Sequence, residues 1–380
     1  MSAAPVDCAL TVNAGSSSIK YALFARDGDP AVPVLSGQVE GLGVGGRGHA
    51  QGMADVLDRM AGGAARVWRV AVVGHRIVHG GTAFAQPVLI DEAVLQALHA
   101  LAPLAPLHQP HNLSGVAAAR AAFPGVPQMA CFDTAFHRTQ AEVHQRFALP
   151  AAWHDAGVRR YGFHGLSYES ICAQLAADEP ALAAGRVVVA HLGNGASMCA
   201  IAGGRSVATT MSFSPLDGLT MGTRCGRLDA AVVLHLIDHH GMDTAAVSEL
   251  LHKQSGLLGL SGLSADMRTL LASEWPAARL ALDHFVESAA RELAGLAAAM
   301  RGIDALVFTG GIGENSGVLR SRIVGTAAWM GLRLDAAANA AGGRCINTSE
   351  SAVQLRVMRT NEEAVIARHA FQVGALPAMR

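Results

Sequence analysis

The chain has 380 residues, enough for two or three domains, and 51% of them are hydrophobic against 16% charged. The formal net charge is -1, and no long run of lysine and arginine stands out, so neither a nucleic-acid-binding protein nor a membrane-surface protein is expected. Six scattered cysteines without a C-x-x-C pair indicate free thiols in a reducing compartment. The first residues lack the pattern of a secretory signal, and no apolar stretch is long enough to cross a bilayer. A cytoplasmic protein with small-molecule partners is therefore the expectation.

Six short apolar runs recur along the chain, and each of them ends abruptly in a polar, mostly glycine-containing segment. They lie at residues 8–20, 70–81, 127–137, 186–195, 303–315 and 353–363. Their length, their β-branched residues and their lack of alternation predict strands that are buried on both faces. Between the strands, apolar residues at three- and four-residue spacing predict helices at 91–101, 113–123, 228–240 and 279–302.

This alternation of strands and helices predicts an α/β protein made of two halves of similar size. In open sheets of this kind, ligands bind beyond the carboxyl ends of the strands, where all six polar segments are expected to lie. A weak internal echo supports duplication, because residues 12–30 and 191–207 share the pattern strand, glycine turn, serine, strand. The second half is expected to begin near residue 185, with the domain boundary at 147–153. The glycine-rich segment 41–52 is expected to be a surface loop, since no strand leads into it.

The segment Asn13–Lys20 (NAGSSSIK) offers three hydroxyls, a glycine turn and one lysine at the end of a strand. A further strand follows it, so it is not a Walker loop, but its backbone N–H and hydroxyl groups suit phosphoryl oxygens. An ordinary polar hairpin turn explains the same residues equally well. On this segment alone, both interpretations stay open.

Two other strand ends carry charged side chains. Arg76, within GHRIVHGG, could hold a carboxylate or phosphate through two hydrogen bonds, although a single arginine on a loop is more commonly a surface residue. Asp133, within FDTAFH, could hold Mg²⁺ or orient a nucleophile, or it could cap a helix. Apolar residues on both sides favour the functional interpretation of Asp133. In RRYGFHG, by contrast, Phe163 and His164 taken alone fit core residues.

Three later segments are also candidates. Residues 213–226 have no helix or strand pattern, and long irregular segments in compact domains are often functional. Arg224 lies there between two glycines and would be free to approach an anion. Residues 309–316 (TGGIGENS) pass from strand to glycine turn to helix start, which suits an anion or a nucleotide. Glu362 belongs to an acidic helix start, which the helix dipole alone would explain.

Together these segments closely resemble the motifs of the acetate kinase family, in order and over nearly the whole chain. The motifs are NAGSSSIK, GHRIVHGG, FDTAFH, RRYGFHG, HLGNGAS, PLDGLTMGTRCG, FTGGIGENS and RTNEE. The resemblance implies two duplicated actin-like (RNase H-like) βββαβα domains with the active site in the cleft between them. The domains it implies are residues 1–149 plus about 365–380, and residues 150–364.

The resemblance also assigns roles to individual residues. The catalytic residues it implies are Arg76, Asp133, His164 and Arg224. Around the transferring phosphoryl group it places Asn13, Ser16, Ser18, Lys20, His108 and His191. At the nucleotide it places Lys20, His191, Asn194, Gly195, Asp266, Arg268, Gly311, Ile312 and Asn315. Its acyl pocket consists of Arg76, Val78, Leu107, Phe163 and Pro215, and its Mg²⁺ (or Mn²⁺) ligands are Asn13, Asp133 and Glu362.

The implied reaction is reversible phosphoryl transfer from ATP to acetate, giving acetyl phosphate and ADP, in a homodimer. Three positions depart from the family pattern: Met267 stands where an aromatic residue is frequent, Arg227 where an acidic residue is usual, and Gln109 where asparagine is common. A propionate or butyrate kinase is the nearest alternative, with Val78 as the discriminating position. A nucleotide-switched binding protein is the alternative from a different class, but it would not need two arginines at a reaction site.

Overall fold

The computed structural model describes residues 5–62 and 68–373, and the chain divides into two compact units. Unit 1 comprises the residues up to 136, residues 165–170 and the residues from 361 on; unit 2 comprises residues 137–164 and 171–360. The domain boundaries expected from the sequence, at 149/150 and near 365, stay a prediction. The last part of the expected segment 365–380 lies outside the described residues.

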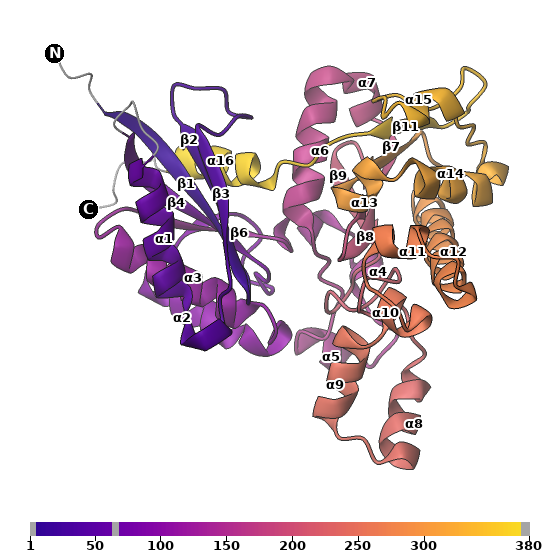
Figure 1. Ribbon diagram of the computed structural model, residues 1–380, viewed down its shortest axis with the longest axis horizontal. Coiled ribbons are helices and arrows are strands. Elements are labelled where there is room, and N and C mark those ends of the chain that lie inside the picture. The colour runs from indigo at the N-terminus through magenta and orange to yellow at the C-terminus, as the bar shows by residue number, and fades with distance from the viewer. Residues whose placement is uncertain (1–4, 63–67, 374–380) are drawn as a thin grey trace. The chain divides into compact units, whose positions relative to one another are not determined.

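The sheet of unit 1 has six strands in the order β3-β2-β1-β4-β6-β5 (Figure 1). Their bounds are β1 Val6–Ala14, β2 Ser18–Ala25, β3 Leu35–Glu40, β4 Trp68–Ile77, β5 Val88–Leu89 and β6 Gln128–Phe132. Strands β1, β2 and β3 form an antiparallel meander, whereas β1, β4 and β6 run parallel. Because parallel strands end at the same edge of a sheet, the polar segments after β1, β4 and β6 lie along one edge.

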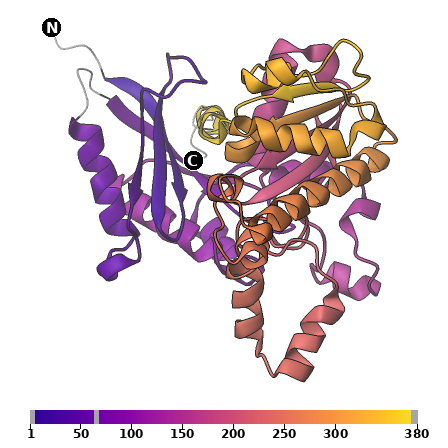
Figure 2. The same ribbon diagram turned by 45° about the vertical axis from the view of Figure 1, so that its right-hand side comes forward.

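Helices cover both faces of this sheet, so its central strands are buried on both sides as predicted. The helices of unit 1 are α1 His49–Gly62, α2 Glu92–Ala100, α3 Gln109–Ala122 and α16 Glu362–Val373, with 3₁₀ turns at Val44–Gly46 and Ala102–Leu104. On β1, Leu10 and Val12 pack in one cluster with α1 and α3, while Ala9 packs in another with α16. Figure 2 shows α16 almost end-on beside the sheet, with α1 on its other side.

The sheet of unit 2 repeats the same plan in the order β11-β10-β7-β8-β9. Its strands are β7 Arg186–Leu192, β8 Ala196–Ala202, β9 Arg205–Thr209, β10 Ala305–Thr309 and β11 Gln354–Val357. An antiparallel meander, β7-β8-β9, is again extended by parallel strands, β10 and β11, on the other side of its first strand. The duplication expected from the sequence is thus present in the topology of both sheets.

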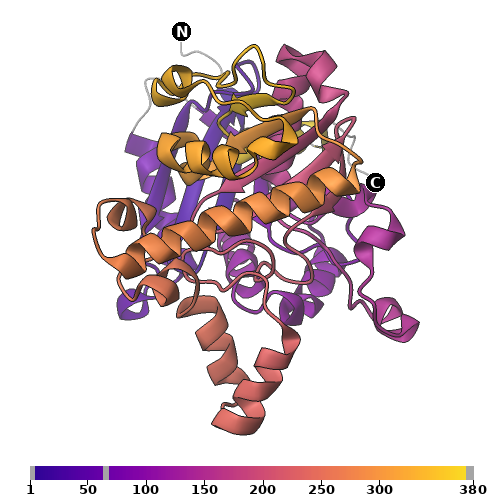
Figure 3. The ribbon, with the colours of Figure 1, turned by 90° about the vertical axis from the view of Figure 1, so that its right-hand side faces the viewer.

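Unit 2 also contains most of the helices. They are α4 Glu142–Gln145, α5 Ala151–Asp155, α7 Pro180–Ala183, α8 Ala230–His240, α9 Thr244–Lys253, α10 Gly256–Ser261, α11 Met267–Leu271, α12 Pro276–Ala299, α13 Gly310–Asn315, α14 Gly317–Thr326 and α15 Ala336–Ala340. A 3₁₀ turn spans Ala328–Met330, whereas the 3₁₀ turn Ala135–Thr139 and helix α6 Gly165–Asp178 begin in unit 1 and end in unit 2. Figure 3 shows the long α12 lying along its unit and the pair α8 and α9 standing away from it.

One expectation for the N-terminal half is wrong in part. Residues 41–52 are not all loop, because α1 begins at His49. From that point Met53, Val56 and Met60 recur at helical spacing and pack against β2. Gly52 allows this close approach, since a Cβ there would come within 2.9 Å of both Ile19 and Leu42.

Among the described residues, no helix is both long enough and apolar enough to cross a membrane.

Candidate active site

The structure gathers the predicted site residues into two groups, one in each unit. In unit 1 the β1–β2 turn is closed by the Gly15 N–H, which donates to the Ser18 carbonyl at 2.9 Å. This turn leaves Ser16 and Ser17 exposed, and Asn13 and Lys20 face each other across the hairpin just before it. The turn therefore leaves two serine hydroxyls accessible, which is compatible both with a phosphate-binding segment and with an ordinary polar hairpin turn.

Three charged side chains meet at the end of the parallel strands of unit 1. Arg76, at the end of β4, donates to both carboxylate oxygens of Asp133, which follows β6, with distances of 3.0 and 2.6 Å. Its Nε lies 3.8 Å from a carboxylate oxygen of Glu362, at the start of α16, and its Nη1 donates to the Asn13 amide oxygen at 3.4 Å. Asp133 is only 1% exposed, so this ion pair is largely shielded from water.

Negative charge exceeds positive charge in this cluster. Beside Glu362 lies Glu363, whose carboxylate is 2.5 Å from Lys20 Nζ. Burial raises the pKa of Glu362 to about 7; the Arg76 guanidinium opposes this rise, whereas Asp133 and Glu363 add to it. The same carboxylates hold the pKa of Arg76 above its usual value although burial acts against its charge. Three carboxylates against two cations leave room for a further positive charge.

A divalent cation suits this surplus of carboxylate. Mg²⁺ prefers oxygen ligands and is commonly held by one or two carboxylates together with water and substrate phosphates. Asn13, Asp133 and Glu362 offer such oxygens within one cluster. Among residues 5–62 and 68–373, no three His, Cys, Asp or Glu side chains form a ready-made metal site. The donor set therefore fits an ion that is completed by substrate oxygens.

The glycine-rich segment after β3 supports the β1–β2 turn, a contact that the sequence did not predict. The Leu42 N–H donates to the Ser17 carbonyl at 3.0 Å, and His49 Nε2 lies 2.9 Å from the Gly15 carbonyl oxygen. The His49 ring also stacks on His111 of α3, with centroids 5.7 Å apart. In the sequence, only the helical spacing of apolar residues from position 49 on indicates that a helix begins at this histidine and packs beside the turn.

The residues predicted for the acyl pocket in unit 1 follow β4 and precede α3. Val78 is buried, and its N–H donates to Asn112, whose amide in turn donates to the Ala14 carbonyl and so ties the ends of β1 and β4 together. Leu107 is 40% exposed, and His108 is the N-cap residue of α3. Gln109, one of the departures from the family pattern, is buried and bonds the backbone of His79, so its role here is structural.

In unit 2, His164, His191, Arg224 and the turn after β7 lie together. His164 has a left-handed backbone (φ 57°), bonds Ser197 through Nδ1 at 2.8 Å, and stacks on His191 with centroids 4.4 Å apart. Arg224 donates to the Pro215 carbonyl at 2.7 Å. A Cβ on Gly195 would lie 2.9 Å from Arg224 Nη2, so glycine is what permits this close approach.

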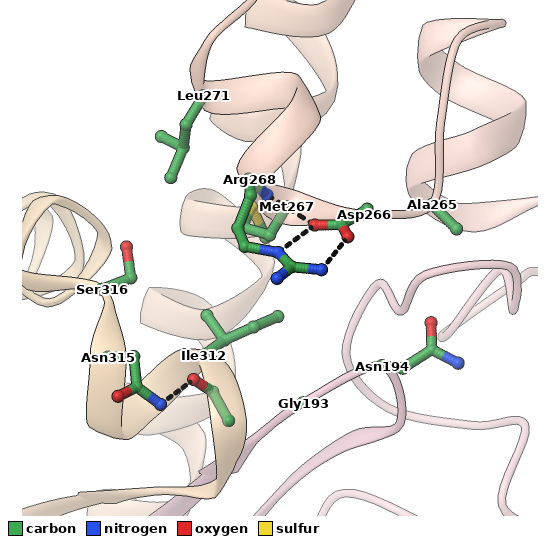
Figure 4. Close-up of a pocket in the computed structure, with 11 residues that line it drawn as sticks. Gly193, Asn194, Ala265, Asp266, Met267, Arg268, Leu271, Ile312, Asn315 and Ser316 are labelled. Atoms are coloured by element: carbon green, nitrogen blue, oxygen red, sulfur yellow. Dashed lines mark hydrogen bonds and ion pairs between the residues drawn. The ribbon is translucent and has the colours of Figure 1, made fainter.

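Next to this group is a cavity of about 680 Å³, whose lining residues Figure 4 shows in close-up. It is lined by Gly193, Asn194, Ala265, Asp266, Met267, Arg268, Leu271, Gly311, Ile312, Asn315 and Ser316. Six of the predicted nucleotide residues line it: Asn194, Asp266, Arg268, Gly311, Ile312 and Asn315. Gly195 and His191 are not among its lining residues, and Lys20 belongs to unit 1.

The cavity has one charged end and one apolar wall. Asp266 and Arg268 form a bidentate pair at 3.1 and 2.5 Å, and this pairing lowers the pKa of Asp266 to about 2. Met267, Leu271 and Ile312 supply apolar surface. Met267, noted as a departure from the family pattern, is nearly buried and belongs to this wall. A flat, apolar ligand part with a polar extension fits such a lining.

The start of α13 is not an open anion site, contrary to the expectation for residues 309–316. The Glu314 carboxylate folds back and accepts from the Gly310 N–H at 2.9 Å, so the chain's own anion occupies the helix start. The other end of α13 is held by Arg320, a buried arginine that donates to the Gly313 and Glu314 carbonyls and to Asn339. Arg320 could not be predicted from the sequence, because no motif marks an arginine whose partners are carbonyls.

Comparison with known proteins gives one consistent match. The family model described as the acetokinase family matches residues 8–368. A curated relative named acetate kinase, from Methylocella silvestris, is 48% identical over 95% of this chain and 96% of its own length. A crystal structure of Porphyromonas gingivalis acetate kinase is 35% identical with a TM-score of 0.87, covering 97% of this chain and 99% of that one. A propionate kinase from Francisella tularensis is 33% identical with a TM-score of 0.88, covering 96% and 99%.

The raised pKa of Glu362 predicts how its removal changes stability with pH. Below pH 4.5, the ordinary pKa of a glutamate, the Glu362 carboxyl is protonated in the folded and in the unfolded chain. The stability that the proton gives to the folded chain is lost as the pH rises through the folded-state pKa of about 7. Glu362→Gln stays neutral, so relative to the unsubstituted chain its free energy of unfolding should rise by about 1–3 kcal/mol between about pH 5 and about pH 8. Urea unfolding of both proteins in EDTA measures the difference between their free energies of unfolding. A difference that stays constant between about pH 5 and about pH 8 would contradict the prediction.

Proposed function

This chain belongs to the acetokinase family, and from that membership we propose that it transfers the γ-phosphoryl group of ATP to acetate. The products are acetyl phosphate and ADP, and the reaction is reversible. Two features of the site support this proposal. Arg76, at a strand end, is bonded to both carboxylate oxygens of Asp133. Near the second arginine, Arg224, lies a cavity large enough for a nucleotide. Anion-on-anion phosphoryl transfer needs such groups.

The proposed step is direct in-line attack. An acetate oxygen forms a bond to the γ-phosphorus while the bond from that phosphorus to the β,γ-bridging oxygen breaks, and ADP leaves with the electron pair. Acetate is ionised at neutral pH, so no general base has to remove a proton. What the protein supplies is alignment and relief of repulsion between anions. Arg76 and Arg224 supply the positive charge, and His164, fixed by its bond to Ser197, donates to the phosphoryl oxygens.

Asn13, Asp133 and Glu362 are the proposed holders of Mg²⁺ (or Mn²⁺). When bound, the metal would neutralise charge on the phosphate oxygens. Asp133 also orients Arg76 through its two hydrogen bonds, so the carboxylate serves the arginine as well as the metal. The proposed phosphate surroundings also include Ser16 in the β1–β2 turn, Ser18 and Lys20 at the start of β2, and His108 at the start of α3.

The cavity of unit 2 is the proposed adenosine site. Asp266 and Arg268 face the ribose, and the apolar wall of Met267, Leu271 and Ile312 packs against the base. Gly311 and Asn315 border the same space, with the Asn315 amide held to the Gly311 carbonyl at 2.9 Å. The phosphates extend toward a polar group on and after β7, formed by His191, Asn194 and Gly195.

A homodimer is the proposed assembly. None of the eleven residues of α8, all of which the structure describes, is buried, although most of them are apolar. Val232 and Leu234 present large apolar side chains there, with Leu234 60% exposed, and the exposed Leu228 lies just before the helix. Apolar side chains gathered on a projecting helix suit the centre of a contact with a second copy of the chain.

The proposed compartment is the cytoplasm. The six cysteines are all free thiols, and ATP is the phosphoryl donor. A reducing compartment that contains ATP suits both features.

Trapping the product with hydroxylamine tests the reaction. With Mg-ATP, acetate and hydroxylamine, the chain should form acetyl hydroxamate, and Arg224→Ala should lower turnover by about 10²-fold or more because transition-state charge loses its partner. Arg279→Ala, which removes an exposed arginine of α12, is the matched control and should leave the rate unchanged. No product with acetate or propionate would overturn the proposed function; near-normal turnover of Arg224→Ala would overturn its role.

A propionate or butyrate kinase is the alternative function, and one of the similar solved structures is a propionate kinase at 33% identity. The preference of this chain for short or longer acyl chains tests that alternative. One methylene in an apolar pocket is worth about 1–3 kcal/mol, so propionate should be a poorer but real substrate. Val78→Ala should raise kcat/KM for propionate relative to acetate by about tenfold. Val73→Ala, which removes the same atoms from the buried middle of β4, should leave the ratio as it was. An unchanged ratio in Val78→Ala would exclude Val78 from the pocket.

Light scattering after gel filtration tests the assembly. The unsubstituted chain should elute with the mass of two copies, and Leu234→Glu should elute as a monomer because a buried, unpaired carboxylate is costly in an interface. Val318→Glu on α14, which also replaces an exposed apolar residue, is the control and should remain dimeric. A dimer that survives Leu234→Glu would place the contact elsewhere.

A further inference from the structure

The segment that carries Arg224 is fastened to one face of helix α12. We call residues 213–227 the Arg224 loop. Its Thr220 bonds Ser288 through its N–H at 3.1 Å and His284 through its hydroxyl at 2.8 Å. Its last residue, Arg227, reaches Glu292 with Nη2 to Oε1 at 2.8 Å. The three partners are spaced four residues apart, so they form a single stripe along α12.

Arg227 closes the loop on itself as well as on the helix. Its backbone N–H donates to the Gly218 carbonyl at 2.9 Å, which brings the two ends of residues 218–227 together. Gly226 makes this closure feasible, because its φ is 73° and a Cβ there would lie 2.4 Å from the Leu219 carbonyl oxygen. The side chain of Arg227 therefore extends from a backbone position that is already fixed.

The ion pair stabilises the charge of Glu292 more than that of Arg227, because Glu292 is the more deeply buried partner. The Glu292 side chain is 12% exposed and that of Arg227 is 67% exposed. Burial raises the pKa of Glu292, Arg227 is the main cation opposing that rise, and Asp217 adds to it, with smaller opposing contributions from Arg291 and Arg160. Arg160 is itself 3.7 Å from Asp217. Without Arg227, a largely buried carboxylate would face a second carboxylate from the loop.

Arg224 depends on the shape of this loop. Its guanidinium donates to the carbonyl of Pro215, which lies on the other side of the loop, and its approach to Gly195 leaves no space for a Cβ. On the far side, α10 holds the backbone through Leu257 and Leu258, whose N–H groups donate to Met221 and Gly222 at 2.8 and 2.9 Å. The Arg224 loop is thus held by α10 on one side and by α12 on the other.

We propose that Arg227 and Glu292 are positioning residues that clasp the Arg224 loop to α12 and so set where the Arg224 guanidinium lies. This rests on the proposed function for the part played by Arg224. An acidic residue at 227 would face Glu292 with like charge, and the loop would lose its attachment.

A charge swap tests the clasp. Arg227→Glu should lower turnover about tenfold or more, because two carboxylates then face each other and Arg224 is displaced. Glu292→Arg should lower it similarly, and the double variant Arg227→Glu/Glu292→Arg should return to within about threefold of the unsubstituted chain, since the pair is restored in reverse. Glu287→Gln, an exposed glutamate on α12 beside the same loop, is the matched control and should change nothing.

Hydrogen exchange of the backbone provides a readout that does not depend on turnover. Amides of residues 213–227 should exchange faster in Arg227→Ala and in Arg227→Glu, and regain protection in the double variant, while the strands of both sheets stay protected. If the unsubstituted chain forms no acyl phosphate, the proposed function fails and exchange alone decides the clasp. The clasp is overturned if the double variant is no better than the worse single variant in rate and in protection. Single variants with normal rates and normal exchange would also overturn it.

Discussion

The bidentate pair between Arg76 and Asp133 is the interaction on which the arrangement of unit 1 depends. Both residues follow parallel strands, and the pairing of β4 with β6 brings their side chains to the same edge of the sheet. The pair is largely shielded from water, so it needs further partners, and Asn13 and Glu362 provide them from β1 and α16. Three carboxylates face two cations there, and a bound cation would offset this surplus of negative charge.

The second constraint is the repeated plan of the two sheets. In each unit a three-stranded meander is extended by parallel strands, so polar segments from distant parts of the chain end along one edge. In unit 1 this edge holds the carboxylates and Arg76. In unit 2 it holds the turn after β7, and the cavity beside that turn is closed by α11 and α13. Duplication therefore supplies two similar frames, which carry different chemistry.

Much of the fold and part of the site could be predicted from the sequence because both rest on local patterns. Buried strands, helical spacing and glycine-rich strand ends predicted the sheets, and the rule that ligands bind beyond strand ends predicted that the segments containing Arg76 and Asp133 lie where strands end. What was missed depends on contacts between segments far apart in the sequence. His49 supports the Gly15 turn from the next helix, Arg320 binds carbonyls, and Glu292 reaches a loop 65 residues earlier at Arg227. The self-capping of α13 by Glu314 was missed because a glycine-rich helix start looks the same whether it is open or filled.

The central claim is that an acetate oxygen attacks the γ-phosphorus of ATP, and isotopic labelling tests it most directly. The chain is incubated with Mg-ATP and acetate labelled with ¹⁸O in both carboxylate oxygens, and the product is observed by ³¹P NMR. The account predicts an acetyl phosphate resonance shifted by one ¹⁸O on phosphorus, because the bridging oxygen comes from acetate. An unshifted acetyl phosphate resonance, or the absence of acetyl phosphate, would contradict it.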